Sequence, residues 1–179
     1  MAGVIMGKLV EKRKLSPDTV LVTVELEKQL VFVPGQFGIV SFGGHEKEGR
    51  AYSFCSLPGS KRVEFCVKMY PGGRFSSLLA SAGEGAGMEV KGPFGLFKLG
   101  DFSGDVVLVG GGTGIAPLRS MAQFLVRQGG MRKVWVFYRF KTPEDFLFRE
   151  EWMELQEKHK NVAVVPSVSS PDAKWVGET

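Results

Sequence analysis

Three residues of one short segment, Arg50, Tyr52 and Ser53, carry the side chains that a flat, phosphate-bearing ligand requires. A guanidinium group pairs with phosphate oxygens, a tyrosine ring covers a planar heterocycle, and a serine hydroxyl hydrogen-bonds to its edge. The segment RAYSFCS is a candidate strand, so the three groups are held close together. Taken alone, the pattern is explained more readily as an ordinary exposed strand.

Two glycine-rich segments are candidate phosphate or nucleotide sites. PGGRFSSLL, residues 71–79, has glycines that lead into a predicted helix, whose free N–H groups and positive dipole end suit a phosphate. GGGTGIAP, residues 110–117, lies between a predicted strand and a predicted helix, where glycines let a dinucleotide approach the backbone. A serine-capped helix after a glycine turn explains the first segment equally well. A structural turn explains the second equally well.

The elements that must position these motifs change in kind near Gly100. Before it, β-forming runs separated by turn signals predict one helix at about 75–82 and six strands, at 4–10, 19–26, 37–42, 51–57, 63–69 and 88–91. The second strand, TVLVTVEL, alternates aliphatic residues with Thr23 and Glu25, which is typical of a half-buried antiparallel strand. Regular short strands at this spacing favour a small barrel or sandwich.

After Gly100, predicted strands and helices alternate. One strand ends in the glycines at 110–112, Pro117 suits the first turn of a helix that runs to about Arg127, and strand 133–140, helix 143–158 and strand 162–169 follow. Buried valine runs with helices between them indicate a parallel sheet. We therefore predict an antiparallel six-stranded barrel over 1–100, followed over 101–179 by an α/β unit that is incomplete beside a full nucleotide-binding domain.

Composition limits what these motifs can mean. The net charge is +4, and all of the excess lies in residues 1–100, which have 13 basic against 9 acidic side chains. No basic run with interleaved aromatics indicates a nucleic-acid surface. Two cysteines are too few for an iron–sulfur cluster, and we expect both to be reduced. Without a signal peptide or an apolar run near the ~20 residues of a membrane span, the sequence predicts a cytoplasmic protein.

The order and spacing of the motifs carry more information than any one of them. RAYSFCS, the VK pair at 67–68, GGRFS, the turn KGPFG at 91–95 and GGGTGIAP follow one another along nearly the whole chain. Together they resemble the ferredoxin-reductase-like flavoproteins, in which an antiparallel Greek-key barrel binds the flavin and a following α/β domain binds NADH or NADPH. The resemblance implies a reductase that transfers hydride from NAD(P)H to a bound flavin and then passes electrons to a protein or small acceptor. The expected flavin is FAD rather than FMN. Ferredoxin, a hydroxylase component, a hydrogenase subunit and ferric ion all stay open as that acceptor.

Carried over position by position, the resemblance assigns roles to the motif residues. Tyr52 would pack beside the isoalloxazine and Ser53 would hydrogen-bond near flavin N5, so these two are the expected catalytic residues. The others are expected cofactor contacts: Arg50, Gly73, Arg74, Phe75 and Ser76 at the diphosphate, Val67 and Lys68 along the ribityl and phosphate groups, and Gly111, Gly112, Thr113, Gly114 and Pro117 at the nicotinamide side. His45 and His159 lie in charged stretches and are expected to be solvated, and no metal site is expected.

The sequence departs from the family pattern in three places. The C-terminal segments that help to hold the nicotinamide are not found before Thr179, so the chain is expected to be either part of a longer protein or a flavin barrel with a shortened partner domain. Arg139 and Lys141 replace the usual Gly and Arg, and Ser170 stands where many relatives carry an arginine. The missing cation favours NADH over NADPH. Two rival hypotheses stay open: a non-catalytic flavin-bearing relay subunit of a larger complex, and a flavin-free barrel for protein interaction.

Overall fold

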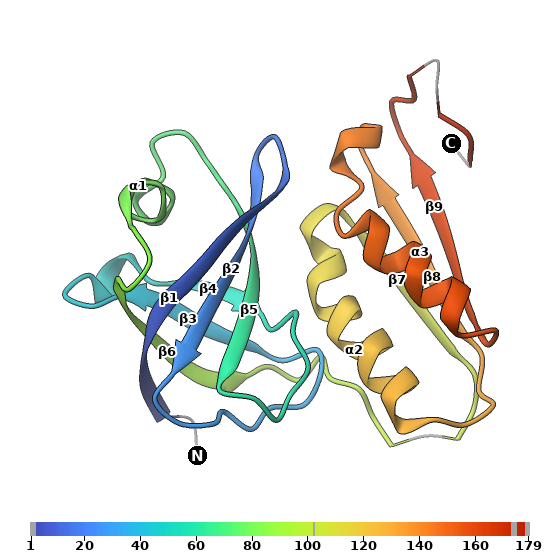
Figure 1. The fold of residues 1–179 in the computed structure, drawn as a ribbon, viewed down its shortest axis with the longest axis horizontal. Coiled ribbons are helices and arrows are strands. Elements are labelled where there is room, and N and C mark those ends of the chain that lie inside the picture. The colour runs from blue at the N-terminus through green and yellow to red at the C-terminus, as the bar shows by residue number, and fades with distance from the viewer. Residues whose placement is uncertain (1–2, 102, 173–174, 178–179) are drawn as a thin grey trace.

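The computed structural model describes residues 3–101, 103–172 and 175–177. Figure 1 shows two units side by side, a barrel built from the first half of the chain and a sheet with helices built from the second half. The barrel is a six-stranded antiparallel sheet in the order β4-β3-β6-β1-β2-β5. Its strands are β1 (Gly3–Ser16), β2 (Thr19–Leu26), β3 (Phe37–Phe42), β4 (Arg50–Ser53), β5 (Arg62–Lys68) and β6 (Gly87–Phe94).

The barrel is nearly closed because its two edge strands meet just beyond β4. Phe54 forms an isolated antiparallel bridge with Phe65 of β5, so the strand predicted at 51–57 is regular only as far as Ser53. Strand β1 is longer than predicted, since register shifts along its pairing with β2 let it bend around the core and continue to Ser16. All six predicted strands are present, which confirms the barrel.

One face of β2 differs from the expectation of a half-buried strand. Val22, Val24 and Leu26 point into the barrel core, as the alternation predicts. On the other face, Thr23 is buried as well, and Leu21 belongs to the hydrophobic cluster of the second unit. The α/β unit therefore covers a face that the sequence alone assigned to solvent.

Helix α1 (Arg74–Ser81) lies against one end of the barrel and follows the glycines as predicted (Figure 1). Phe75 and Leu79 bury its apolar face in the barrel core. At its C-terminal end, the ammonium group of Lys12 donates hydrogen bonds to the carbonyl oxygens of Leu79 at 2.9 Å and Ala82 at 2.5 Å. These carbonyls have no partner within a helix, so Lys12 stabilises the end of α1.

The second unit is a parallel sheet in the order β7-β8-β9. It comprises β7 (Val106–Gly111), α2 (Ile115–Gln128), β8 (Val134–Phe140), α3 (Arg149–Lys158) and β9 (Val162–Val168), and α2 lies next to the barrel (Figure 1). The parallel arrangement and the limits of α2 confirm the predictions. The valine runs, however, are not buried throughout, since Val107, Val109, Trp135 and Phe137 on one face of the sheet are exposed.

The helix predicted over 143–158 is wrong in its first part. Pro143–Asp145 forms a single 3-10 turn, in which the Thr142 and Asp145 side chains form a capping box. The chain then reverses at Phe148, which has a left-handed φ of 59°, before α3 begins. Burial of Phe146, Leu147 and Phe148 explains the break, because a continuous helix could not turn three consecutive apolar side chains into one core. Within the described residues, no helix is long and apolar enough to cross a membrane.

Candidate functional site

A cavity of about 320 Å³ lies where the barrel meets the N-terminal end of α2. Its barrel wall includes Tyr52, Ser53 and Lys68, and its opposite wall includes Thr113 and Gly114. The remaining lining residues are Ala51, Cys66, Tyr70, Ala116 and Pro117. The structure thus brings the expected catalytic residues of β4 and the glycine-rich loop to opposite sides of one space.

Strand β4 holds Tyr52 and Ser53 through backbone pairing with β3, opposite Gly38 and Phe37. The Tyr52 ring packs against Phe75 of α1, with ring centroids 5.3 Å apart. Burial raises the pKa of the Tyr52 hydroxyl to about 12. A tyrosine hydroxyl is neutral at physiological pH already at its ordinary pKa, so this group is available as a hydrogen-bond donor.

The start of β4 and the start of α1 converge around Glu48. The Arg50 guanidinium donates to the carbonyl oxygens of Glu48 at 3.1 Å and Gly49 at 2.9 Å. Arg74, on the first turn of α1, lies 3.7 Å from the Glu48 carboxylate. Two arginines from segments that are separate in the sequence therefore lie at the same edge of the barrel, as a shared phosphate site requires.

The glycine-opened turn before α1 has the geometry of a phosphate cradle. No side chain of the described residues caps the first turn of α1, so its leading N–H groups are available to an anion. A Cβ on Gly73 would lie 3.1 Å from the Tyr70 carbonyl oxygen and 3.2 Å from Ser76 Oγ, so a larger residue would crowd this turn. Ser76 Oγ accepts the Tyr70 N–H at 3.0 Å, which leaves its own hydrogen free to donate. These groups fit the diphosphate of a flavin dinucleotide.

Two expected contact residues do not present their side chains to this site. Val67 and Phe75 are only 1% and 3% exposed, and both side chains lie in the barrel core. Any contact that they make with a cofactor must come from their backbone atoms. Lys68, the next residue after Val67, points out of the barrel instead.

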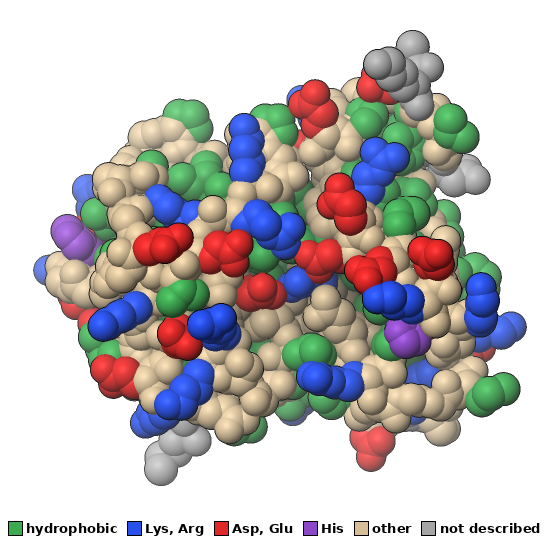
Figure 2. Space-filling model, viewed as in Figure 1, with side chains coloured by type: hydrophobic (Ala, Val, Ile, Leu, Met, Phe, Trp, Pro, Cys, Tyr) green, Lys and Arg blue, Asp and Glu red, His purple; other side chains and the backbone are tan. Residues whose placement is uncertain are grey.

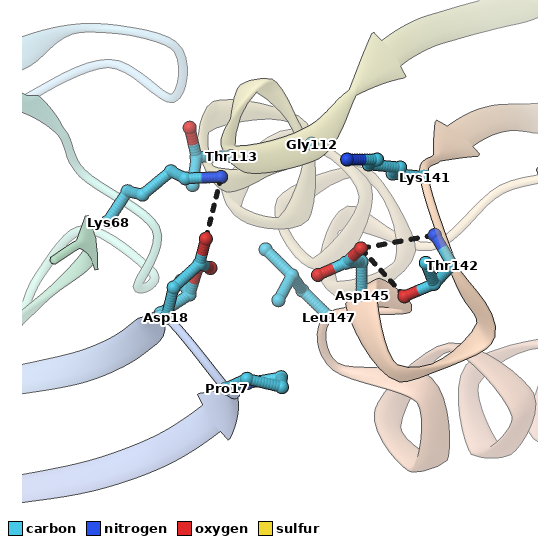
Figure 3. Close-up of a pocket in the computed structure, with 10 residues that line it drawn as sticks. Pro17, Asp18, Lys68, Gly112, Thr113, Lys141, Thr142, Asp145 and Leu147 are labelled. Atoms are coloured by element: carbon cyan, nitrogen blue, oxygen red, sulfur yellow. Dashed lines mark hydrogen bonds and ion pairs between the residues drawn. The ribbon is translucent and has the colours of Figure 1, made fainter. Parts of the chain in front are cut away.

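A second cavity, of about 370 Å³, continues from Lys68 and Thr113 between the two units (Figure 3). Lys68 pairs with Asp18 at 2.9 Å, and this contact lowers the pKa of Asp18 and raises the pKa of Lys68. Across the cavity lie Lys141 and Asp145, the latter held by the Thr142 backbone and hydroxyl. The sequence alone does not indicate this ion pair, because Asp18 and Lys68 lie far apart in the chain.

The glycine-rich loop has a conformation that its residues dictate. Gly112 has a φ of 51°, and Gly112–Gly114 form a 3-10 turn that runs directly into α2, with Pro117 buried in its first turn. Tyr138 fixes the loop from β8, since its hydroxyl lies 3.1 Å from the Gly112 carbonyl oxygen. A Cβ on Gly110 would lie 2.7 Å from a Leu118 methyl group and 3.3 Å from the Gly114 carbonyl oxygen, so glycine lets α2 pack closely on β7.

The fold, an antiparallel barrel followed by a parallel α/β unit with a cavity between them, is that of the oxidoreductases in which an FAD-binding domain precedes an NAD-binding domain. Residues 6–99, just over half of the chain, match the oxidoreductase FAD-binding domain, and residues 108–179 match the oxidoreductase NAD-binding domain. The chain belongs to the ferredoxin-NAD(P)H reductase-like flavoprotein family.

Known relatives include reductase components of oxygenase systems. The toluate 1,2-dioxygenase electron transfer component of Pseudomonas putida is 31% identical over 166 residues, which is 91% of this chain and 49% of that protein. Sulfhydrogenase 2 subunit gamma of Pyrococcus furiosus is 34% identical over 133 residues, covering 73% of this chain and 45% of that protein. The structure is similar to that of a cytochrome P450 reductase from Amycolatopsis, with a TM-score of 0.88, 28% identity, and coverage of 99% of this chain and 55% of that one. The chain spans about half the length of the curated relatives that it matches.

Proposed function

We propose that this chain takes reducing equivalents from NADH or NADPH into FAD held on the barrel, and passes electrons on to a protein or small acceptor. When bound, the flavin supplies the redox chemistry, because it accepts hydride and can release electrons singly. The protein contributes binding, orientation and exclusion of water.

One observation supports this proposal above the others. Tyr52 and Ser53 of the barrel and Thr113 and Gly114 of the second unit line the same cavity. Groups bound separately by the two units would have their reactive ends in this space, where proximity makes transfer effectively intramolecular.

Each residue then has a physical task. Arg50, Arg74 and the first turn of α1 hold the diphosphate, with Gly73 and Ser76 shaping the cradle. Tyr52 packs against the ring system, and the Ser53 hydroxyl donates a hydrogen bond at its reactive edge. Lys68 and the Val67 backbone border the ribityl chain of the flavin. The loop of Gly111, Gly112, Thr113 and Gly114 contacts the nicotinamide cofactor, and Pro117 lies in the first turn of the helix that follows this loop.

A spectroscopic experiment tests the function directly. The purified chain should be yellow, should release FAD on denaturation, and should lose its visible flavin absorbance when NADH or NADPH is added without oxygen. Ser53→Ala should slow this bleaching while retaining the flavin, whereas Ser60→Ala, at an exposed turn of the same unit, should not slow it. A colourless protein that takes up no added FAD or FMN would refute the proposal and leave the flavin-free barrel.

A relay subunit is the second candidate, and the exposed sheet face favours it. Val107, Val109, Trp135 and Phe137 form an apolar surface, with the Trp135 and Phe137 rings stacked 6.5 Å apart. Such a surface suits a neighbouring subunit. A yellow protein that neither nucleotide bleaches would support the relay function over the reductase.

The choice of nucleotide depends on Arg139. The sequence favours NADH because Ser170 replaces an arginine, but Arg139 supplies a cation nearby, hydrogen-bonded to Ser169 Oγ at 3.1 Å and Ser167 Oγ at 3.2 Å. This arrangement supports NADPH as the alternative donor, since a guanidinium pairs well with a phosphate. Rates of flavin reduction measured with NADH and with NADPH decide between the two donors.

Three further points stay predictions. These are a ferredoxin or complex subunit as the electron acceptor, the cytoplasmic location, and the division of the chain at residue 100.

A further inference from the structure

A charged cluster centred on a buried arginine joins the two units, and the proposed function does not use it. At its centre is Arg119 of α2, which is only 7% exposed. Figure 2 shows acidic and basic side chains interspersed along the line where the two units meet. The cluster is built from residues of both units.

The Arg119 guanidinium contacts three segments at once. Its Nη1 donates to the Cys55 carbonyl oxygen and to Glu64 Oε2, both on the barrel and both at 2.7 Å. Its Nε donates to Glu151 Oε2 of α3, also at 2.7 Å, and its Cζ lies 4.7 Å from the centroid of the Phe148 ring.

The neighbouring residue of α2 repeats the contact with the barrel. Ser120 is completely buried, and its hydroxyl donates to the Ser56 carbonyl oxygen at 2.7 Å. Two consecutive residues of α2 therefore bind the carbonyl groups of two consecutive residues of the barrel.

The charges of the cluster are balanced. Arg13 of β1 lies 2.9 Å from the Glu151 carboxylate, so Arg13, Glu151, Arg119 and Glu64 alternate in sign. Apolar contacts alone would let the two units slide over each other, whereas a planar guanidinium requires its acceptors in fixed directions. A buried charge that loses a partner is costly, so the cluster allows one relative placement of the units far better than others.

The cluster adjoins the cavity along the chain on both units. Cys55 lies two residues after Ser53, and Arg119 lies two residues after Pro117. Each wall of the 320 Å³ cavity thus continues within two residues into one half of the cluster. We propose that Arg119, assisted by Ser120, is a positioning residue that fixes the separation of Ser53 and Thr113 across this cavity. The inference rests on the proposed function only for its kinetic consequence, because the placement of the units can be measured without turnover.

The first test measures that placement. Spin labels at Lys61→Cys on the barrel and Glu157→Cys on α3, both exposed positions, report the distance between the units. The native Cys55 and Cys66 are buried, and burial raises the pKa of both thiols, so they label poorly. In the labelled chain that retains Arg119, the distribution of distances between the two labels should have one narrow peak. Arg119→Met should broaden or shift it, while Arg127→Met, at an exposed position of the same helix, should not.

The second test measures anaerobic flavin reduction at saturating nucleotide. Arg119→Met should retain FAD but reduce the rate about 10- to 100-fold, as expected for displaced reacting groups. Arg119→Lys keeps the positive charge but lacks the planar guanidinium group. Its rate of flavin reduction should lie between the rates of the wild type and of Arg119→Met. Ser120→Ala removes the hydrogen bond to the Ser56 carbonyl oxygen and leaves every charged residue in place. It is therefore the milder variant to use if Arg119→Met does not fold.

The outcomes separate the two proposals. An unchanged distance distribution in Arg119→Met and Ser120→Ala would overturn the positioning role, whatever the wild type does with nucleotide. A changed distribution with an unchanged reduction rate would overturn the kinetic consequence. If the wild type is not reduced by NADH or NADPH, the proposed function fails, and the distance measurement still decides whether Arg119 fixes the units.

Discussion

Arg50→Ala tests most directly whether the barrel holds a diphosphate where its two motifs converge. The Arg50 guanidinium is already oriented by the Glu48 and Gly49 carbonyl oxygens, so little side-chain freedom is lost when a phosphate binds. A hydrogen bond to a charged group contributes about 1.5 to 3 kcal/mol. Because Arg50 is exposed, we expect the lower end of this range, a loss of affinity of about 10-fold.

Arg74 provides an internal comparison for Arg50. Its side chain is 79% exposed and lies 3.7 Å from the Glu48 carboxylate, so it is held less firmly than Arg50. Arg74→Ala should therefore weaken FAD binding less than Arg50→Ala does. The double variant should lose more affinity than either single variant, since both cations would contact the same diphosphate in the proposed site.

Titration of the apoprotein with FAD, followed by flavin fluorescence at several salt concentrations, measures these affinities. Arg62→Ala is the matched control, because Arg62 is an exposed arginine of the same barrel that pairs with Glu25 instead. Its Kd should stay within about two-fold of the wild type. An unchanged Kd in Arg50→Ala, or an equal loss in Arg62→Ala, would refute the shared phosphate site.

Three further predictions concern stability. Lys12→Met removes the hydrogen bonds at the end of α1 and should lower the free energy of unfolding in urea by about 1 kcal/mol. Gly110→Ala should lower the free energy of unfolding by about 1 to 3 kcal/mol, because the added methyl group overpacks the contact with α2. Gly104→Ala should lower it much less in the same assay, because a Cβ there meets nothing within 4 Å. The Asp18–Lys68 pair lowers the pKa of Asp18 and raises that of Lys68, so its stabilisation should be fully present between their ordinary values of 3.8 and 10.5. It should be lost as pH falls through the lowered Asp18 pKa or rises through the raised Lys68 pKa, and Asp18→Asn should remove the acid-side loss from a Tm series over pH.

The barrel could be predicted from the sequence because its signals are local. Each strand has a run of β-formers bounded by turn residues, and the structure contains all six strands. The helix over 143–158 was partly wrong because periodicity does not show that Phe146, Leu147 and Phe148 all enter one core. The covered face of β2 is not visible in its own residues for a related reason, since Leu21 belongs to a cluster whose α/β members begin only at Val106.

The candidate site was only partly predictable. Arg50 and Arg74 were linked by resemblance to a family, because no local pattern joins two segments more than twenty residues apart. The sequence alone does not indicate the role of Arg119. In an amphipathic helix an arginine between apolar residues indicates a solvated face, and its carboxylate partners lie 55 and 32 positions away in the chain.

The two units differ from independent domains in how they meet. Leu21, Cys55 and Cys66 of the barrel belong to the same hydrophobic cluster as the core of the α/β unit. Shared apolar burial favours contact between the units but does not specify a register, because it is not directional. The hydrogen bonds of Arg119 and Ser120 are directional, so they can select one register from the many that the apolar surfaces allow. Ser53 and Pro117 line the cavity, and each lies two positions in the chain from Cys55 or Arg119. The geometry of the cavity therefore depends on how the barrel and the α/β unit fold against each other.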